Sequence, residues 1–295
     1  MQARDDSQQA AMEVLDLPRF EGALAQLRPK YASSEPFPHI VLDNFLLPEV
    51  ARRAIDEFGA VDPASWINYL HVNERKLANR DIEAWGLTLR AVAQRLNSPD
   101  FVRALGELTG ISDLHVDETL HGGGLHESMP GGFLNIHADF TVHPEHRHWR
   151  RRVNLLLYFN EDWPAHYGGD LELWSRDMKQ CVESVAPLAN RAVIFNTDPD
   201  AYHGHPEPLR CPPGTARWSL ALYYYTVEDN PQVRATHYRP RPREGPRAAL
   251  IYLDNLALRV YDRAKRLLGV SDQAAGRVLK RLHRTRRETR NHRTG

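Results

Sequence analysis

Short strand-like segments separated by turn residues dominate the middle of the chain and constrain its fold more than any other feature. They are predicted at residues 114–120, 132–140, 151–159, 169–174, 180–186, 191–197 and 216–226. Glycine and proline clusters, for example at residues 122–124 and 212–214, lie at the corners between them. Strands of this length and spacing are typical of a sandwich or a double-sheet jelly roll. We therefore expect a mainly β protein with flanking helices and a jelly-roll core.

Helical patterns flank this β-rich region. A β-rich entry strand is predicted at residues 36–45, with a helix starting near residue 47, and residues 83–109 have the spacing of two helices. The expected organisation has three parts. Residues 1–35 form a loosely attached, helical amino-terminal extension, residues 36–228 form the jelly-roll domain with its supporting helices, and residues 229–295 form a basic, helical carboxy-terminal extension.

Composition excludes several classes of protein. With 42% hydrophobic and 26% charged residues, the 295-residue chain is expected to be soluble and globular. Lysine plus arginine equal aspartate plus glutamate at 38 each, so the charge balance does not indicate nucleic-acid binding. No signal-peptide pattern or membrane-spanning apolar run is found, and Cys181 and Cys211 are too few for a disulfide framework. We expect a cytoplasmic protein.

Residues 133–140 contain the first candidate metal ligands. Polar residues alternate with apolar ones there, so a strand would direct Asn135, His137 and Asp139 to the same side. A His-x-Asp pair alone is weak evidence, because a second pair occurs at His115 and Asp117. A non-haem Fe(II) site needs two imidazoles and one carboxylate, so a further histidine must follow on a later strand.

Downstream residues can complete such a site. His203 lies 66 residues after His137, and Arg217 lies 14 residues farther on, at the start of the run at residues 216–226. Alternation there puts Arg217 on the same face as Ser219, Ala221 and Tyr223. A planar guanidinium is suited to binding a carboxylate through two hydrogen bonds.

Five ordered segments resemble the prolyl-4-hydroxylase-like family of Fe(II)/2-oxoglutarate-dependent dioxygenases. They lie at residues 133–140, 153–163, 168–174, 203–206 and 217–225. The resemblance implies a double-stranded β-helix, which is a jelly roll with the metal between its two sheets. It also implies an enzyme that uses O₂ and 2-oxoglutarate, with ascorbate as a candidate reductant, to hydroxylate an unactivated C–H bond and release succinate and CO₂. The implied substrates are prolyl or other peptidyl groups, amino-acid-like molecules and other small molecules.

The same resemblance implies roles for individual residues. His137, Asp139 and His203 would hold Fe(II), which makes them the catalytic residues. Arg217 would bind the distal carboxylate of 2-oxoglutarate, and Tyr158 would donate its hydroxyl to the same group. By this criterion the pair at residues 115 and 117 is structural.

Three departures from the family pattern leave alternatives open. His205 is the rival of His203 as third metal ligand. The interval between His203 and Arg217 is long, so Arg210 is the fallback for the cosubstrate arginine. The usual cosubstrate tyrosine before the metal strand has no counterpart, and Asn135 is proposed in its place.

Other hypotheses concern partners and surfaces. The histidines and arginines at residues 143–152 are interpreted as a solvated loop over the active-site mouth, in preference to a second metal or anion site. The basic stretch at residues 280–287 is a solvated helix or a contact for an acidic partner. A homo-oligomer is also considered. The functional alternative is a non-catalytic metal-binding jelly roll or a sugar-modifying protein without 2-oxoglutarate turnover.

Overall fold

Antiparallel pairing links the named strands into one nearly closed sheet that folds over on itself. The computed structural model describes residues 13–242, 244–246 and 248–253. The chain divides into two units, Met1–Tyr252 and Leu253–Gly295, and all elements named below lie in the first. The basic stretch at 280–287 and most of the predicted carboxy-terminal extension lie outside the described residues.

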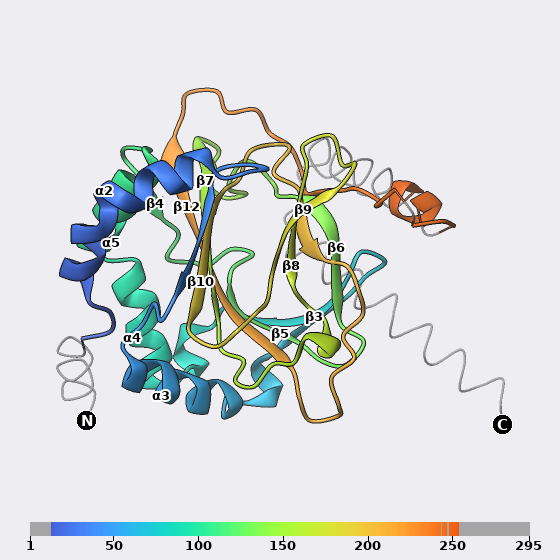
Figure 1. The fold of residues 1–295 in the computed structure, drawn as a ribbon, viewed down its shortest axis with the longest axis horizontal. Coiled ribbons are helices and arrows are strands. Elements are labelled where there is room, and N and C mark those ends of the chain that lie inside the picture. The colour runs from blue at the N-terminus through green and yellow to red at the C-terminus, as the bar shows by residue number, and fades with distance from the viewer. Residues whose placement is uncertain (1–12, 243, 247, 254–295) are drawn as a thin grey trace. The chain divides into compact units, whose positions relative to one another are not determined.

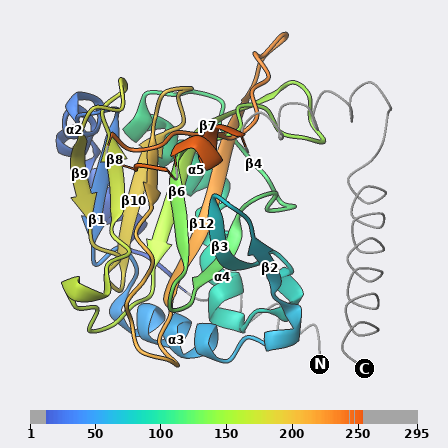
Figure 2. The ribbon, with the colours of Figure 1, turned by 90° about the vertical axis from the view of Figure 1, so that its right-hand side faces the viewer.

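The sheet has two facing halves, which confirms the predicted jelly roll (Figures 1 and 2). The first half consists, in spatial order, of β1 (His39–Asp43), β10 (Arg191–Asn196), β7 (Trp149–Tyr158), β12 (Arg217–Val227) and β5 (Gly124–Ser128). The second consists of β6 (Phe133–Ala138), β11 (His203–His205), β8 (Leu171–Trp174) and β9 (Cys181–Val185). Three short strands pair outside this order: β2 (Ile67–Leu70), β4 (His115–Val116) and β13 (His237–Tyr238).

Strand β3 (Glu74–Asn79) joins the two halves at one edge. Its last three residues pair with β5, and its first two pair with β6. At the other end of the interior, Tyr158 and Phe195 of the first half pack against Leu171 and Leu173 of the second half. The two halves therefore enclose a space that is closed by packing at one end.

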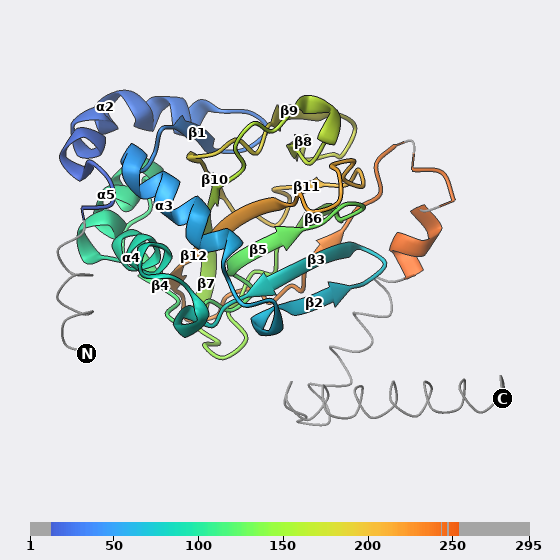
Figure 3. The same ribbon diagram turned by 90° about the horizontal axis from the view of Figure 1, so that it is seen from below.

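Helices cover the outer face of the first half (Figure 3). They are α2 (Leu17–Ser33), α3 (Pro48–Gly59), α4 (Leu87–Leu96) and α5 (Pro99–Thr109), with short 3-10 turns at Pro63–Ser65, Ile82–Ala84 and Ala165–Tyr167. Strand alternation explains this layer. Leu155, Leu157, Leu220 and Leu222 belong to the same buried cluster as the apolar faces of the helices. Their neighbours in sequence on β7 and β12 consequently face the interior.

The amino-terminal helix is firmly packed, so the expectation of a loosely attached extension was wrong. Asp16 caps α2 by accepting a hydrogen bond from the Arg19 N–H at 2.9 Å. Phe20 stacks on Phe101 of α5 with ring centroids 5.9 Å apart. The Tyr31 hydroxyl donates to the Asn196 side chain at 2.6 Å. The apolar spacing in this segment is too weak to predict a packed helix. Contacts with α5, which is distant in sequence, hold α2 in place.

Three strands near the cavity, β2, β3 and β5, were missed. The hairpin of β2 and β3 lies in a region rich in polar residues, and its second strand pairs with both sheet halves. The predicted strand at 114–120 is reduced to β4, and β5 instead begins at the glycine run taken for a corner. A Cβ at Gly124 would lie 2.4 Å from the Asn79 carbonyl oxygen, so this run permits close approach of two backbones.

Glu57 of α3 caps the amino terminus of α4, whose own N-cap, Gly86, has no side-chain acceptor. Its two carboxylate oxygens accept hydrogen bonds from the N–H groups of Thr88 and Leu89, each at 2.9 Å. We expect Glu57→Ala to lower the free energy of unfolding by about 1–2 kcal/mol in urea denaturation, because a lost cap leaves these donors unpaired. Asp56→Ala, an exposed change beside it on the same helix, is the control. An equal loss in both variants would contradict the cap.

No helix among the described residues has the length and apolar character needed to cross a membrane.

Candidate active site

A cavity of about 360 Å³ lies between the two halves of the sheet and brings together the main residues predicted from sequence. His137 on β6 and His203 on β11 are directly paired across neighbouring strands. Asp139 follows β6 immediately. Arg217 and Ser219 of β12 line the same cavity from the opposite half.

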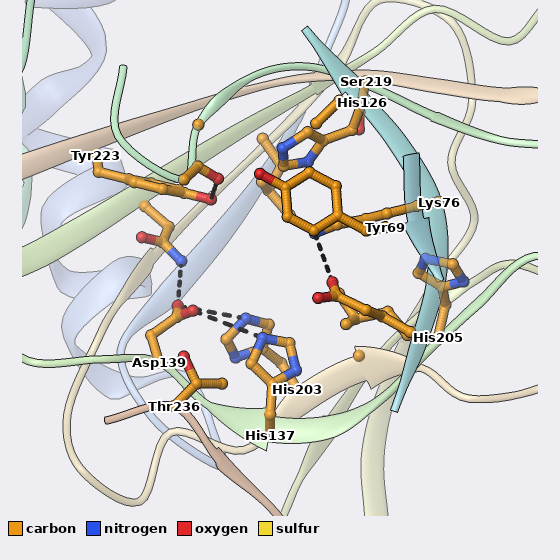
Figure 4. Close-up of a pocket in the computed structure, with 18 of the residues that line it drawn as sticks. Tyr69, Lys76, His126, His137, Asp139, His203, His205, Ser219, Tyr223 and Thr236 are labelled. Carbon is orange, nitrogen blue, oxygen red and sulfur yellow. Dashed lines mark hydrogen bonds and ion pairs between the residues drawn. The ribbon is translucent and has the colours of Figure 1, made fainter. Parts of the chain in front are cut away.

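The side chains of His137, Asp139 and His203 converge on one point (Figure 4). Asp139 Oδ1 lies 3.5 Å from His137 Nε2, and Asp139 Oδ2 lies 3.6 Å from His203 Nε2. One candidate ligand atom from each residue lies within 4.8 Å of the other two. Two imidazoles and one carboxylate in this arrangement are the donor set of a mononuclear non-haem iron site.

The orientation of both imidazoles also fits a metal. The Nδ1 atoms of His137 and His203 lie 2.9 Å from the carbonyl oxygens of Asn135 and Ala201, respectively. A carbonyl only accepts, so each Nδ1 carries the proton and each Nε2 keeps its lone pair for a cation. The residues present therefore fit a divalent metal.

Burial sets the charge state of this group. Burial, followed by the effect of His137, lowers the pKa of His203 to about 4, so the ring is neutral at pH 7. Burial alone would raise the pKa of Asp139, but the Arg151 guanidinium and the two histidines keep it well below its usual range. A carboxylate and neutral imidazoles are the protonation states that metal binding requires.

Arg217 is fixed in place at the cavity wall. Its Nε donates to the Gly169 carbonyl oxygen at 2.7 Å, and its Nη2 donates to the Tyr158 hydroxyl at 3.2 Å. Gly169 has φ +82°, and a Cβ there would lie 3.0 Å from the Arg217 side chain. The absence of a side chain at Gly169 therefore makes room for Arg217. Tyr158 is fully buried behind it, and burial raises the pKa of its hydroxyl.

Two of the residues considered for cosubstrate binding lie elsewhere. Arg210 is exposed and does not line the cavity. Asn135 donates its side-chain N–H to the Asn73 side chain at 3.0 Å, and Leu134 lines the cavity instead. The pairing of β6 with β11 shifts register between His203 and His205, which interrupts the alternation that placed Asn135 beside His137.

The two candidates for the third ligand are separated by the fold. His203 belongs to the converging group, whereas His205 lines the cavity farther along β11. Burial lowers the pKa of His205 well below its usual value, and its Nδ1 has no hydrogen-bond partner among the residues that the structure describes.

We expect His203→Ala to weaken Mn(II) binding by more than roughly 100-fold, because even residues that only support metal ligands are worth about 10–100-fold. His205→Ala is expected to retain the metal. Titration of both variants by electron paramagnetic resonance distinguishes the two histidines. Loss of binding in His205→Ala alone would reverse the assignment.

Several cavity residues were not found from sequence. His126 of β5 and Lys76 of β3 line the cavity near Arg217, whereas Tyr223, farther along β12, lines it on the face that strand alternation predicted. Burial lowers the pKa of His126 well below its usual value, so this ring is neutral. His126 lies on β5, which was not predicted from the sequence, so strand alternation could not be used to place its side chain.

The loop hypothesis for residues 143–152 was wrong in part. Strand β7 begins at Trp149, and the side chain of Arg151 is buried at 2% exposure. His143 is also buried, and its Nε2 lies 3.2 Å from Asp117 Oδ2.

The second His-x-Asp pair lies apart from the converging group. Asp117 accepts hydrogen bonds from Thr119 and His121, and the His115 ring stacks on Trp149 with centroids 5.9 Å apart.

Part of the chain matches a known oxygenase family, in agreement with the predicted resemblance. Residues 123–225 match the model of the 2OG-Fe(II) oxygenase superfamily. Over 79 residues the chain is 33% identical to the Mus musculus protein named "Prolyl 3-hydroxylase OGFOD1". The matched stretch is 25% of this chain and spans only 14% of the length of that relative.

Similar solved structures include two prolyl hydroxylases. One is the prolyl hydroxylase from Trichoplax adhaerens, in complex with a peptide fragment of the hypoxia inducible factor oxygen degradation domain. It is 16% identical to this chain, with a TM-score of 0.52, and the match covers 71% of this chain and 91% of that one. A prolyl-4-hydroxylase from Pseudomonas putida is 22% identical, with TM-score 0.48, over 69% of this chain and 99% of that one. The first similarity supports the jelly-roll fold.

Proposed function

We propose that the chain is a 2-oxoglutarate-dependent dioxygenase that hydroxylates an unactivated C–H bond, because residues 123–225 match the model of the 2OG-Fe(II) oxygenase superfamily. In this reaction one oxygen atom of O₂ enters the substrate as a hydroxyl group and the other enters succinate. Succinate and CO₂ are the products of 2-oxoglutarate. Ascorbate is the proposed reductant that keeps the iron in the ferrous state.

One observation carries this proposal. The converging His137, Asp139 and His203 share a buried cavity with Arg217, a fixed cation on the facing half of the sheet. The three ligand residues would hold Fe(II) through two nitrogen atoms and one oxygen atom. Bound Fe(II) supplies the oxidising chemistry together with 2-oxoglutarate and O₂.

The residues of the chain prepare the cavity for this chemistry. Arg217 is proposed to bind the remote carboxylate of 2-oxoglutarate, supported by Tyr158, to which it is hydrogen-bonded. Apolar side chains of Leu134, Leu156 and Leu171 line the walls between the two polar ends. They limit water near the reacting groups and so reduce side reactions.

A prolyl group, in a peptide or a smaller molecule, is the proposed substrate class. The curated relative is named as a prolyl 3-hydroxylase, and the Trichoplax adhaerens enzyme is recorded with a peptide. In this chain the hairpin of β2 and β3 borders the cavity through Ile67 and Tyr69, which are 48% and 40% exposed. Exposed apolar side chains at a cavity mouth suit contact with a substrate larger than an amino acid.

The test is a turnover assay with Fe(II), ascorbate and 2-oxoglutarate, in which succinate is measured with and without prolyl peptides or free amino acids. We expect slow succinate release without substrate and faster release with a prolyl substrate, which gains one oxygen atom by mass spectrometry. Succinate release without any hydroxylated product from these compounds would reject the substrate class. Absence of succinate under all conditions would reject the dioxygenase activity.

A further inference from the structure

Two residues of β7 contact one oxygen of Asp139. Asp139 Oδ2 accepts a hydrogen bond from Asn154 Nδ2 at 2.8 Å and lies 3.0 Å from Arg151 Nη2. Arg151 Nε in turn donates to Asn154 Oδ1 at 2.9 Å. The three side chains are therefore linked in a closed ring by two hydrogen bonds and by the ion pair of Arg151 with Asp139.

Arg151 cannot easily leave this ring. Its guanidinium carbon lies 3.4 Å from the ring centroid of Tyr223 and 4.7 Å from that of Phe140. The Tyr223 hydroxyl donates to the Gly122 carbonyl oxygen at 2.8 Å, which fixes the ring that covers the guanidinium. An arginine that is buried, stacked and hydrogen-bonded has a single available position.

The ring makes the two oxygens of Asp139 inequivalent. Oδ2 accepts the hydrogen bond from Asn154 and is the oxygen that faces the Arg151 guanidinium, and it lies 3.6 Å from His203 Nε2. Oδ1 has neither of the two β7 contacts and lies 3.5 Å from His137 Nε2. We propose that Arg151 and Asn154 are positioning residues that restrict Asp139 to one metal-binding oxygen. This inference rests on the proposed metal site.

The consequence concerns open coordination positions. A carboxylate that binds through one oxygen takes one position, whereas one that binds through both takes two. Restricting Asp139 to Oδ1 would therefore keep one more position available for 2-oxoglutarate and O₂. The geometry of the site, and not only its ligand residues, is then specified by β7.

A positioning role and a simple charge effect of Arg151 predict opposite results. The positive charge of Arg151 repels a metal cation, so its removal alone would tighten metal binding. Loss of the ion pair or of the hydrogen bond that orients Asp139 would instead weaken binding, by roughly 10–100-fold for supporting residues of this kind.

The experiment measures Mn(II) binding to the full chain by electron paramagnetic resonance titration, without substrate or 2-oxoglutarate. We expect Arg151→Met and Asn154→Leu to raise the Kd for Mn(II) by roughly 10–100-fold. Arg152→Met is the matched control, because Arg152 is on the same strand but contacts Thr226 and Glu228. Asn154→Leu changes neither charge nor much volume, so it decides the question if Arg151→Met fails to fold.

A second measurement separates positioning from general damage to the fold. The visible d–d spectrum of bound Co(II) reports coordination number, and we expect it to change in Asn154→Leu but not in Arg152→Met. If Asn154→Leu binds Mn(II) as tightly as the unsubstituted chain or more tightly, and its Co(II) spectrum is unchanged, the positioning role is wrong while the proposed metal site stands. If the unsubstituted chain does not bind Mn(II), or binds it equally well after His137→Ala, the metal site is wrong and the inference fails with it.

Discussion

Replacing His137 or Asp139 with alanine is expected to abolish the release of succinate from 2-oxoglutarate that occurs without substrate. Each change removes one of three converging ligand atoms, so Fe(II) should bind more than roughly 100-fold more weakly. The assay is succinate formation at a fixed, limiting Fe(II) concentration, with metal content measured in parallel. The substrate-independent reaction is useful here because it does not depend on the identity of the substrate.

The chain provides its own matched control in the second His-x-Asp pair. His115 is exposed and stacks on Trp149, so His115→Ala should leave succinate release unchanged. Normal turnover in either His137→Ala or Asp139→Ala would show that the metal is held elsewhere.

Arg217→Met is expected to raise the KM for 2-oxoglutarate roughly 30-fold or more, while Mn(II) binding is retained. The physical reason is that removal of one partner of a buried, hydrogen-bonded charge pair costs about 2–5 kcal/mol. Arg217→Lys should give a smaller rise, because lysine keeps the charge but lacks the planar fork of the guanidinium. Steady-state kinetics of succinate release measure both variants.

Arg210→Met tests the alternative arginine. Arg210 lies in the connection between β11 and β12. It is exposed and does not line the cavity, so its replacement should not change the KM for 2-oxoglutarate. An unchanged KM in Arg217→Met, or an equal rise in Arg210→Met, would mean that the distal carboxylate binds elsewhere.

The parts of the fold that local pattern determines were predictable from sequence. Strands β7, β10 and β12 have alternating or continuous apolar residues, because one side packs on the helices and the other faces the interior. His137 and Asp139 are two residues apart, so strand periodicity alone directs them to one side.

Features that depend on contacts between distant segments could not be predicted. Asn135 is removed from the cavity by a register shift between β6 and β11, and no local pattern encodes a register shift. Arg151 belongs to a run of three arginines that looks like a surface, and its burial depends on Asp139, Asn154 and Tyr223 from three segments. Strand alternation directs Arg151 to the opposite face from Arg150 and Arg152. Its burial is tolerated because it is paired with Asp139.

The basic extension beyond residue 253 lies outside the described residues, so contact with an acidic partner stays a prediction.

The most direct test of the proposed site is an anaerobic titration of the full chain with Fe(II) and 2-oxoglutarate. We expect a visible metal-to-ligand charge-transfer band only when both are present. The band should saturate at one equivalent of Fe(II), be absent in His203→Ala, and be followed by succinate release when O₂ is admitted. A metal that binds tightly without this band and without succinate release would contradict the proposal and identify a non-catalytic metal-binding jelly roll.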